Sequence, residues 1–249
     1  MLAQTNLQLY RVMLEKKMEE QSLVRVHTAF DIARSLFGNY SRPNHKPFVC
    51  HLVGTCSALL EWNQSIDLAI AGLLHSAYLY GDFQDGDRGV TARRRKWLES
   101  VLGIKAESYI YAYTKFRKMP LQISCDYCDN SEDPMAEIVQ ILKLADLLDE
   151  LTDCGALYTP NKRLDGIEFT RPDCQEQLIS FVHSRIGPET ANQFRRKFEE
   201  MLQYPPYSSL ISSDQSFSSN GKRNVAVSRS TLGRAVRKVS RKIFKDRAA

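Results

Sequence analysis

The chain has 249 residues, of which 43% are hydrophobic and 25% are charged, which is typical of a globular protein rather than a disordered one. No run reaches the roughly 18 consecutive apolar residues that a membrane span needs, and the first residues lack the pattern of a secretory signal. Six cysteines in a chain of this length do not suggest a disulfide framework, which favours a cytoplasmic location.

The positive charge is concentrated at the C-terminal end of the sequence. Residues 222–249 contain ten Lys or Arg and one acidic residue, a net charge of +9, whereas the whole chain carries +5. Residues 1–221 therefore carry −4. Because this larger part is mildly acidic, we expect no specific nucleic-acid partner for the protein.

Apolar residues recur at helical spacing along most of the chain, and convincing strand alternation is hard to find. The first two helices are predicted near Leu7 and Val24, and Pro47 fits the first turn of a third helix that carries His51. An almost continuously apolar stretch, residues 66–79, predicts a buried central helix. The remaining predicted helices are residues 91–103, 106–116, 135–151, 175–186 and 188–203. The sequence therefore predicts an all-α fold.

The last part of the chain changes composition abruptly. Residues 204–220 are rich in Pro, Ser and Gly, which predicts a linker. Beyond them a basic amphipathic helix is predicted, with the apolar positions Leu232, Val236, Val239 and Ile243. We expect a helical domain at 1–205, a linker at 206–222 and this helix at 223–249, which could hold a cytoplasmic protein at an anionic membrane surface.

Three short segments place metal-type ligands within the predicted helices. They supply His51, His75 and Asp146. An apolar helix face is a poor environment for a polar side chain unless something inside the protein satisfies it. Two histidines and a carboxylate that converge would suit a divalent transition metal such as manganese or iron. The alternative is a set of buried polar residues held by internal hydrogen bonds.

The order and spacing of these segments resemble the HD superfamily and, within it, the (p)ppGpp hydrolase domains of the Rel/SpoT type. Those domains carry Arg-x4-Pro-aromatic-x2-His, Leu-Leu-His-Asp and Lys-Leu-Ala-Asp segments. Residues 42–51, 71–76 and 142–148 match them, except that Ser76 stands where the family has the Asp of its His-Asp pair. The resemblance covers about residues 24–155 and implies an HD-domain-like helical bundle that binds metal through the three residues named above.

The departures from the family bear on activity. A neutral serine hydroxyl is a weak ligand for a divalent ion, so retention of a metal stays open. Leu79 and Tyr80 occupy the positions of an acidic pair in the family hydrolases, and neither side chain does acid–base work at neutral pH. Glu150 takes the place of an Asn that contacts the nucleotide ribose. We therefore expect (p)ppGpp hydrolysis to be absent or very slow.

Two further residues are candidates for catalysis. By the resemblance, Arg42 approaches the phosphates or the base of a substrate, and the alternative for it is a salt bridge. Asp149 lies three residues beyond Asp146, on nearly the same helix face, so it is a replacement for the lost ligand or a general base.

Two functions follow from these residues. One is a divergent HD-type metal-dependent phosphohydrolase whose partner is a nucleotide or another phosphate-bearing small molecule. The other is a non-catalytic HD-like binding or regulatory module that has lost its metal. A di-iron oxygenase on the same scaffold needs more ligands than the chain offers.

Three other features have mainly structural interpretations. The basic run at residues 93–96 could line a phosphate-binding mouth or form a solvated helix face. Cys125 and Cys128 have zinc-knuckle spacing but lack a second pair, so we expect a loop with two free thiols. His27 and His45 are spare candidates for ligands.

Overall fold

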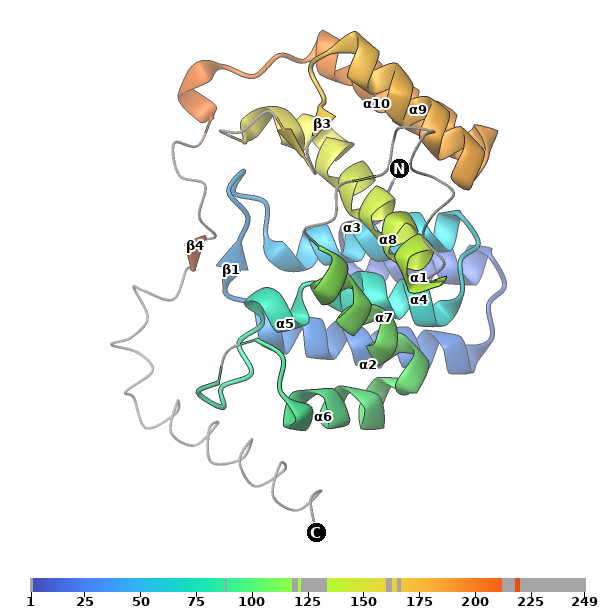
Figure 1. The fold of residues 1–249 in the computed structure, drawn as a ribbon, viewed down its shortest axis with the longest axis vertical. Coiled ribbons are helices and arrows are strands. Elements are labelled where there is room, and N and C mark those ends of the chain that lie inside the picture. Colours follow the sequence, from blue (N-terminus) through green and yellow to red (C-terminus); the bar gives the residue numbers. More distant parts are fainter. Residues whose placement is uncertain are drawn as a thin grey trace.

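The computed structural model describes residues 2–87, 89–117, 121, 134–159, 163–164, 167–211 and 218–219. These residues are predominantly helical, and the strands among them are only two residues long, which confirms the predicted all-α fold (Figure 1). The α-helices are α1 Asn6–Glu15, α2 Glu20–Phe37, α3 Phe48–Glu61, α4 Ile66–Leu74, α5 Ala77–Tyr80, α6 Ala92–Leu102, α7 Ile104–Phe116, α8 Pro134–Leu151, α9 Pro172–Arg185 and α10 Pro188–Gln203.

The helices begin at recognisable sequence signals. The side chain of Thr5 accepts a hydrogen bond from the backbone N–H of Gln8 and forms a reciprocal capping box at α1. Ser65 and Thr91 cap α4 and α6 in the simpler way, each accepting from a backbone N–H three residues ahead. These caps satisfy N–H groups that a helix start leaves without an internal partner.

Helices α3, α4 and α8 form the centre of the fold. Helix α3 packs against both α4 and α8, and Figure 1 shows these helices in the middle of the molecule, between α9–α10 and α6. Gly72 permits the close approach of α4 to α3, because a Cβ there would lie 2.8 Å from the Leu59 side chain and 3.2 Å from the Cys56 backbone. The central helices therefore bring polar residues of the core within contact distance of one another.

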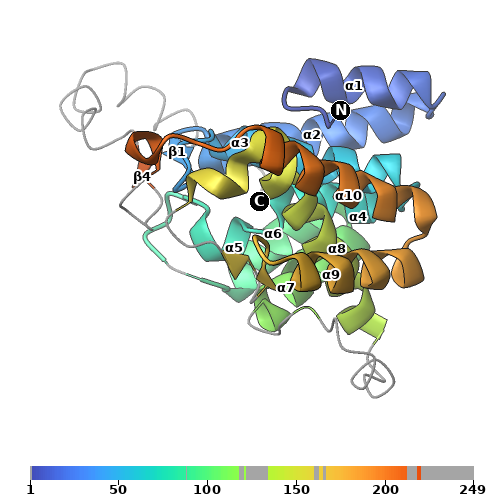
Figure 2. The same ribbon diagram turned by 90° about the horizontal axis from the view of Figure 1, so that it is seen from above.

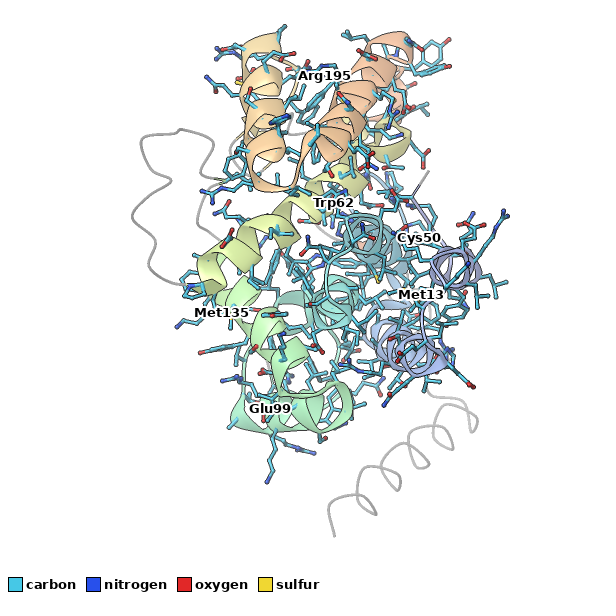
Figure 3. The ribbon with its side chains drawn as sticks, turned by 90° about the vertical axis from the view of Figure 1, so that its right-hand side faces the viewer. Met13, Cys50, Trp62, Glu99, Met135 and Arg195 are labelled. Atoms are coloured by element: carbon cyan, nitrogen blue, oxygen red, sulfur yellow. The ribbon has the colours of Figure 1, made fainter. Side chains whose placement is uncertain are left out.

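The outer helices cover this centre on several sides. Helix α1 lies beside α2 at one edge of the bundle (Figure 2). Helices α9 and α10 pack against each other, and α10 also contacts α8. Figure 3 shows Arg195 of α10 and Glu99 of α6 at opposite ends of the molecule.

The predicted continuous helix at residues 66–79 is wrong in one respect, because the chain breaks at His75 and Ser76. Helix α4 ends at Leu74 and α5 begins at Ala77. The His75 side chain turns back so that its Nδ1 lies 2.9 Å from the carbonyl oxygen of Gly72. This side-chain bond satisfies a carbonyl at the end of α4, which allows the backbone to change direction. Apolar periodicity carries no signal of such a bond.

The remaining described elements are short. Two 3-10 helices, η2 Thr152–Tyr158 and η3 Ser208–Leu210, follow α8 and α10. Strand β1 Tyr40–Ser41 pairs antiparallel with β4 Ser218–Ser219, and β2 Arg163–Leu164 pairs antiparallel with β3 Ile167–Glu168. Part of the predicted linker at 206–222 thus returns to the body of the protein beside Tyr40.

Several predictions fall outside the described residues. These are the basic helix at 223–249 with its membrane contact, and the pair Cys125 and Cys128. Among the residues that the structure describes, no helix is both long and apolar enough to cross a membrane. The cysteines in this part form no disulfide; they are Cys50, Cys56, Cys154 and Cys174.

Candidate metal centre

His51, His75 and Asp146 come together in the core. They belong to α3, to the end of α4 and to α8, respectively, and their potential ligand atoms all lie within 4.8 Å of one another. His51 Nε2 is 2.9 Å from Asp146 Oδ1, and His75 Nε2 is 3.8 Å from the same oxygen. Both imidazoles are buried, whereas the Asp146 side chain is 19% exposed. The cluster is therefore internal, and Asp146 is the most exposed of its three side chains.

Each histidine is oriented by a bond at its other ring nitrogen. Nδ1 of His51 lies 2.8 Å from Asp149 Oδ2, and Nδ1 of His75 lies 2.9 Å from the Gly72 carbonyl oxygen. Since a carboxylate and a carbonyl accept hydrogen bonds, both Nδ1 atoms carry the proton. Both Nε2 atoms then present a lone pair toward Asp146 when the rings are neutral. Metal-binding histidines in proteins are held in this way.

Two atoms of the cluster lack a hydrogen-bond partner. Despite their short separation, His51 Nε2 and Asp146 Oδ1 do not meet hydrogen-bond geometry, and both are buried. A buried polar atom without a partner costs free energy and calls for an explanation. The other oxygen of Asp146 accepts a bond of 3.0 Å from the Tyr113 hydroxyl. This bond fixes the carboxylate so that Oδ1 faces the two histidines.

Asp149 lies behind His51, on the Nδ1 side of its ring. Its side chain is fully buried, and Lys46 Nζ lies 2.7 and 2.9 Å from its two oxygens. Gln4 Nε2 donates a further bond of 3.0 Å to Oδ1. Because its oxygens face these donors, Asp149 orients His51 rather than joining the three ligand atoms as the predicted substitute ligand. These contacts also make it a poor general base.

Arg42 lies at the side of the cluster. Its guanidinium forms an ion pair with Glu150, and only 16% of the Arg42 side chain is exposed. The loop that carries it is closed by two backbone bonds of 2.9 Å, from Arg42 N–H to the Lys46 carbonyl and from His45 N–H to the Arg42 carbonyl. The two basic side chains of this loop thus pair with neighbouring acidic residues of α8, Arg42 with Glu150 and Lys46 with Asp149.

The other candidates from the sequence are not part of the three-residue cluster. Within the basic run at residues 93–96, Arg94 Nε bonds to Asp85 Oδ2 at 2.9 Å, and Arg95 forms two bonds of 2.7 Å with the buried Glu107. These two guanidinium groups are thus engaged in ion pairs. His45 has a positive φ of 65° in the loop before α3, and His27 Nδ1 lies 2.7 Å from the Tyr10 hydroxyl.

Sequence reasoning missed Tyr113 and Lys46 as members of the site. Tyr113 comes from α7 and also places its ring 4.8 Å from that of His75. No motif marks it, because tyrosines are common on buried helix faces. Lys46 lies within the motif-bearing segment, but nothing in its spacing indicates a partner 103 positions away.

The surroundings of the cluster shift the pKa values of its members in opposite directions. Burial lowers the pKa of His75 to about 4, although Asp146 acts against that shift. Burial also disfavours the charged form of His51, but its contacts with Asp146 and Asp149 outweigh burial and raise its pKa. The two histidines and Arg42 hold the pKa of Asp146 far below its usual range, against the effect of burial. At neutral pH, His75 is therefore uncharged and able to act as a ligand.

These shifts predict that the metal-free protein is most stable near pH 6.5, the ordinary pKa of histidine. Below pH 6.5, His75 is protonated in the unfolded chain but stays neutral in the folded protein, because burial lowers its pKa. This difference lowers the free energy of unfolding by up to about 2 kcal/mol at pH 5. Above pH 6.5, His51 retains in the folded state a proton that the unfolded chain loses, so stability declines again. Urea unfolding in the presence of a chelator, repeated across this pH range, measures both losses of stability.

The variant His75→Gln should lose less stability than the wild type between pH 6.5 and pH 5. An equal loss in this variant would contradict the assignment of the effect to His75.

Comparison with known families gives a match over part of the chain. A family model for a domain of unknown function, DUF6817, matches residues 37–118. The matched range contains Arg42, His51 and His75, whereas Asp146 lies beyond it. No curated protein matches the chain.

Proposed function

We propose that the protein is a divergent relative of the HD superfamily, similar to its Rel/SpoT-like members, and that it hydrolyses phosphate esters with a divalent metal. One observation supports this above all others: two buried histidines, each fixed at Nδ1, direct Nε2 toward the same oxygen of Asp146. Oriented nitrogen and oxygen ligands of this kind are typical of transition-metal sites.

The residues present fit such a metal. Two imidazoles and one carboxylate suit manganese, iron or zinc and leave positions for other ligands. Two of the buried atoms that do not meet hydrogen-bond geometry, His51 Nε2 and Asp146 Oδ1, would be ligands of the ion together with His75. When bound, a divalent ion supplies Lewis acidity, which favours ionisation of water and polarises a phosphate oxygen.

The surrounding residues provide binding and orientation. Arg42 presents a planar guanidinium that suits a phosphate, and its pair with Glu150 fixes where that group lies. Asp149 keeps the His51 proton on Nδ1 and leaves Nε2 available. In this proposal Asp149 acts on His51, and Arg42 is the residue that contacts substrate.

One observation favours a non-catalytic binding or regulatory module instead. The carboxylates Asp146, Asp149 and Glu150 are accompanied by Arg42, Lys46 and a His51 whose pKa is raised. With His51 protonated, these six groups carry no net charge, so the cluster can be balanced without a metal. Ser76 in place of the family Asp points in the same direction.

Phosphate-ester hydrolysis separates these functions. We expect wild-type protein with Mn²⁺ to hydrolyse p-nitrophenyl phosphate or a related ester above background, and His75→Gln to abolish that activity. We expect no appreciable release of pyrophosphate from (p)ppGpp, because Leu79 and Tyr80 offer no acidic side chain. Efficient (p)ppGpp hydrolysis would contradict our interpretation of these two positions. Absence of metal-dependent hydrolysis across phosphate mono- and diesters would favour the non-catalytic module.

A further inference from the structure

The N-terminal segment, residues 2–4, is docked onto α3 beside the candidate metal centre. Leu2 and Ala3 are buried in the hydrophobic core. The backbone N–H of Ala3 donates a 3.0 Å hydrogen bond to the hydroxyl of Ser57, a fully buried residue of α3. These contacts precede α1 and hold the extended residues next to the helix that carries His51.

This docking brings Gln4 to the carboxylate of Asp149. Gln4 Nε2 donates a 3.0 Å bond to Oδ1, while His51 Nδ1 lies 2.8 Å from Oδ2. The two oxygens of this carboxylate, which also pair with Lys46 Nζ, thus contact Gln4 on one side and the candidate ligand His51 on the other. Gln4 also bonds to the Ala3 carbonyl at 3.2 Å, which fixes its amide.

The Gln4–Asp149 hydrogen bond lies directly against the backbone of α3 at Gly54. A Cβ on Gly54 of α3 would lie 1.8 Å from Asp149 Oδ1 and 2.9 Å from Gln4 Nε2. Such distances are far below van der Waals contact, so any side chain at this position would displace the carboxylate or the amide. The absence of a side chain at Gly54 therefore leaves the space that the Gln4–Asp149 hydrogen bond occupies.

We propose that Gln4 is a positioning residue of the metal centre, holding Asp149 so that Asp149 in turn fixes the ring of His51. This inference rests on the proposed metal site, and it assigns the segment at residues 2–4 a role in that site. Groups that orient a metal-binding histidine typically change metal affinity by about 10- to 100-fold when removed. Gln4 acts one bond further out, so the expected loss is near the lower end of that range.

Two variants of the full chain, with a matched control, test this role. Gln4→Ala removes the amide N–H that donates to Asp149. Gln4→Glu replaces the amide with a carboxylate of nearly the same shape, which would face the carboxylate of Asp149. Gln21→Ala is the control, because Gln21 is an exposed residue of α2. Urea unfolding establishes that each variant is folded. We then measure Mn²⁺ affinity and, on metal-free protein, the ¹⁵N chemical shifts of His51 that report its protonated ring nitrogen.

We expect Gln4→Ala to lower Mn²⁺ affinity about tenfold and to shift the His51 resonances, Gln4→Glu to do so more strongly, and Gln21→Ala to change neither. Unchanged His51 resonances in Gln4→Ala would overturn the inference, whatever happens to the metal. Shifted resonances in a protein whose wild type binds no Mn²⁺ would support Gln4 as the positioning residue of His51 and overturn the metal proposal. Failure of the Gln4 inference and failure of the metal proposal therefore give different results.

Discussion

Replacing Asp149 with alanine is expected to destabilise the protein by about 3–5 kcal/mol, the usual result when one partner of a buried ion pair is removed. The side chain of Lys46 is only 17% exposed and would lose its counter-charge, while the N–H donors of Gln4 and His51 would lose their acceptor. Urea unfolding of the variant and the wild type measures the difference. A loss below about 1 kcal/mol would show that Asp149 is not the centre of this network.

Two further variants identify the cause of that loss. Glu137→Ala changes an exposed acid of the same helix, α8, and is expected to stay within about 0.5 kcal/mol of wild type. The double variant Lys46→Met with Asp149→Asn removes both charges but keeps an acceptor for His51. It should recover much of the lost stability, because no unpaired charge is then buried.

Metal affinity should depend strongly on His75 and on its neighbour Ser76. His75→Gln removes one of three ligands and is expected to weaken Mn²⁺ binding by at least about two orders of magnitude. Ser76→Asp adds a charged ligand next to His75 and is expected to tighten binding about tenfold or more. Calorimetric titration of metal-free protein at constant pH measures both changes.

Ser76→Ala is the matched control for the second variant. Because we assign no ligand role to the Ser76 hydroxyl, its removal should leave Mn²⁺ affinity close to that of wild type. Equal affinity of wild type and Ser76→Asp would mean that position 76 does not face the metal, contrary to the resemblance on which the proposal draws.

Much of the helical architecture could be predicted because apolar spacing and capping residues act locally. Thr91 and the residues after it predicted α6 almost to its ends, and α8 differs from its prediction by one residue at its start. The proximity of His51, His75 and Asp146 required more than local patterns. It was expected from the family resemblance, since periodicity alone does not show that α3, α4 and α8 meet.

What the sequence could not predict consists of contacts between distant positions and of one side-chain-to-backbone bond. Gln4 and Asp149 are separated by 145 positions, and only the docked N-terminal segment makes them neighbours. Asp149 was predicted as a ligand or base because helical spacing places it near Asp146, but spacing does not show which ring nitrogen of His51 it faces. The break at His75 depends on its bond to the Gly72 carbonyl, to which hydrophobic patterning is insensitive.

The central claim, that these residues hold a metal, is tested most directly by anomalous diffraction at the manganese edge from crystals soaked in Mn²⁺. We predict a single strong peak within bonding distance of His51 Nε2, His75 Nε2 and Asp146 Oδ1, with the peak absent in His75→Gln crystals treated identically. No peak between these atoms in wild-type or Ser76→Asp crystals would contradict the claim and leave the cluster as a metal-free polar core.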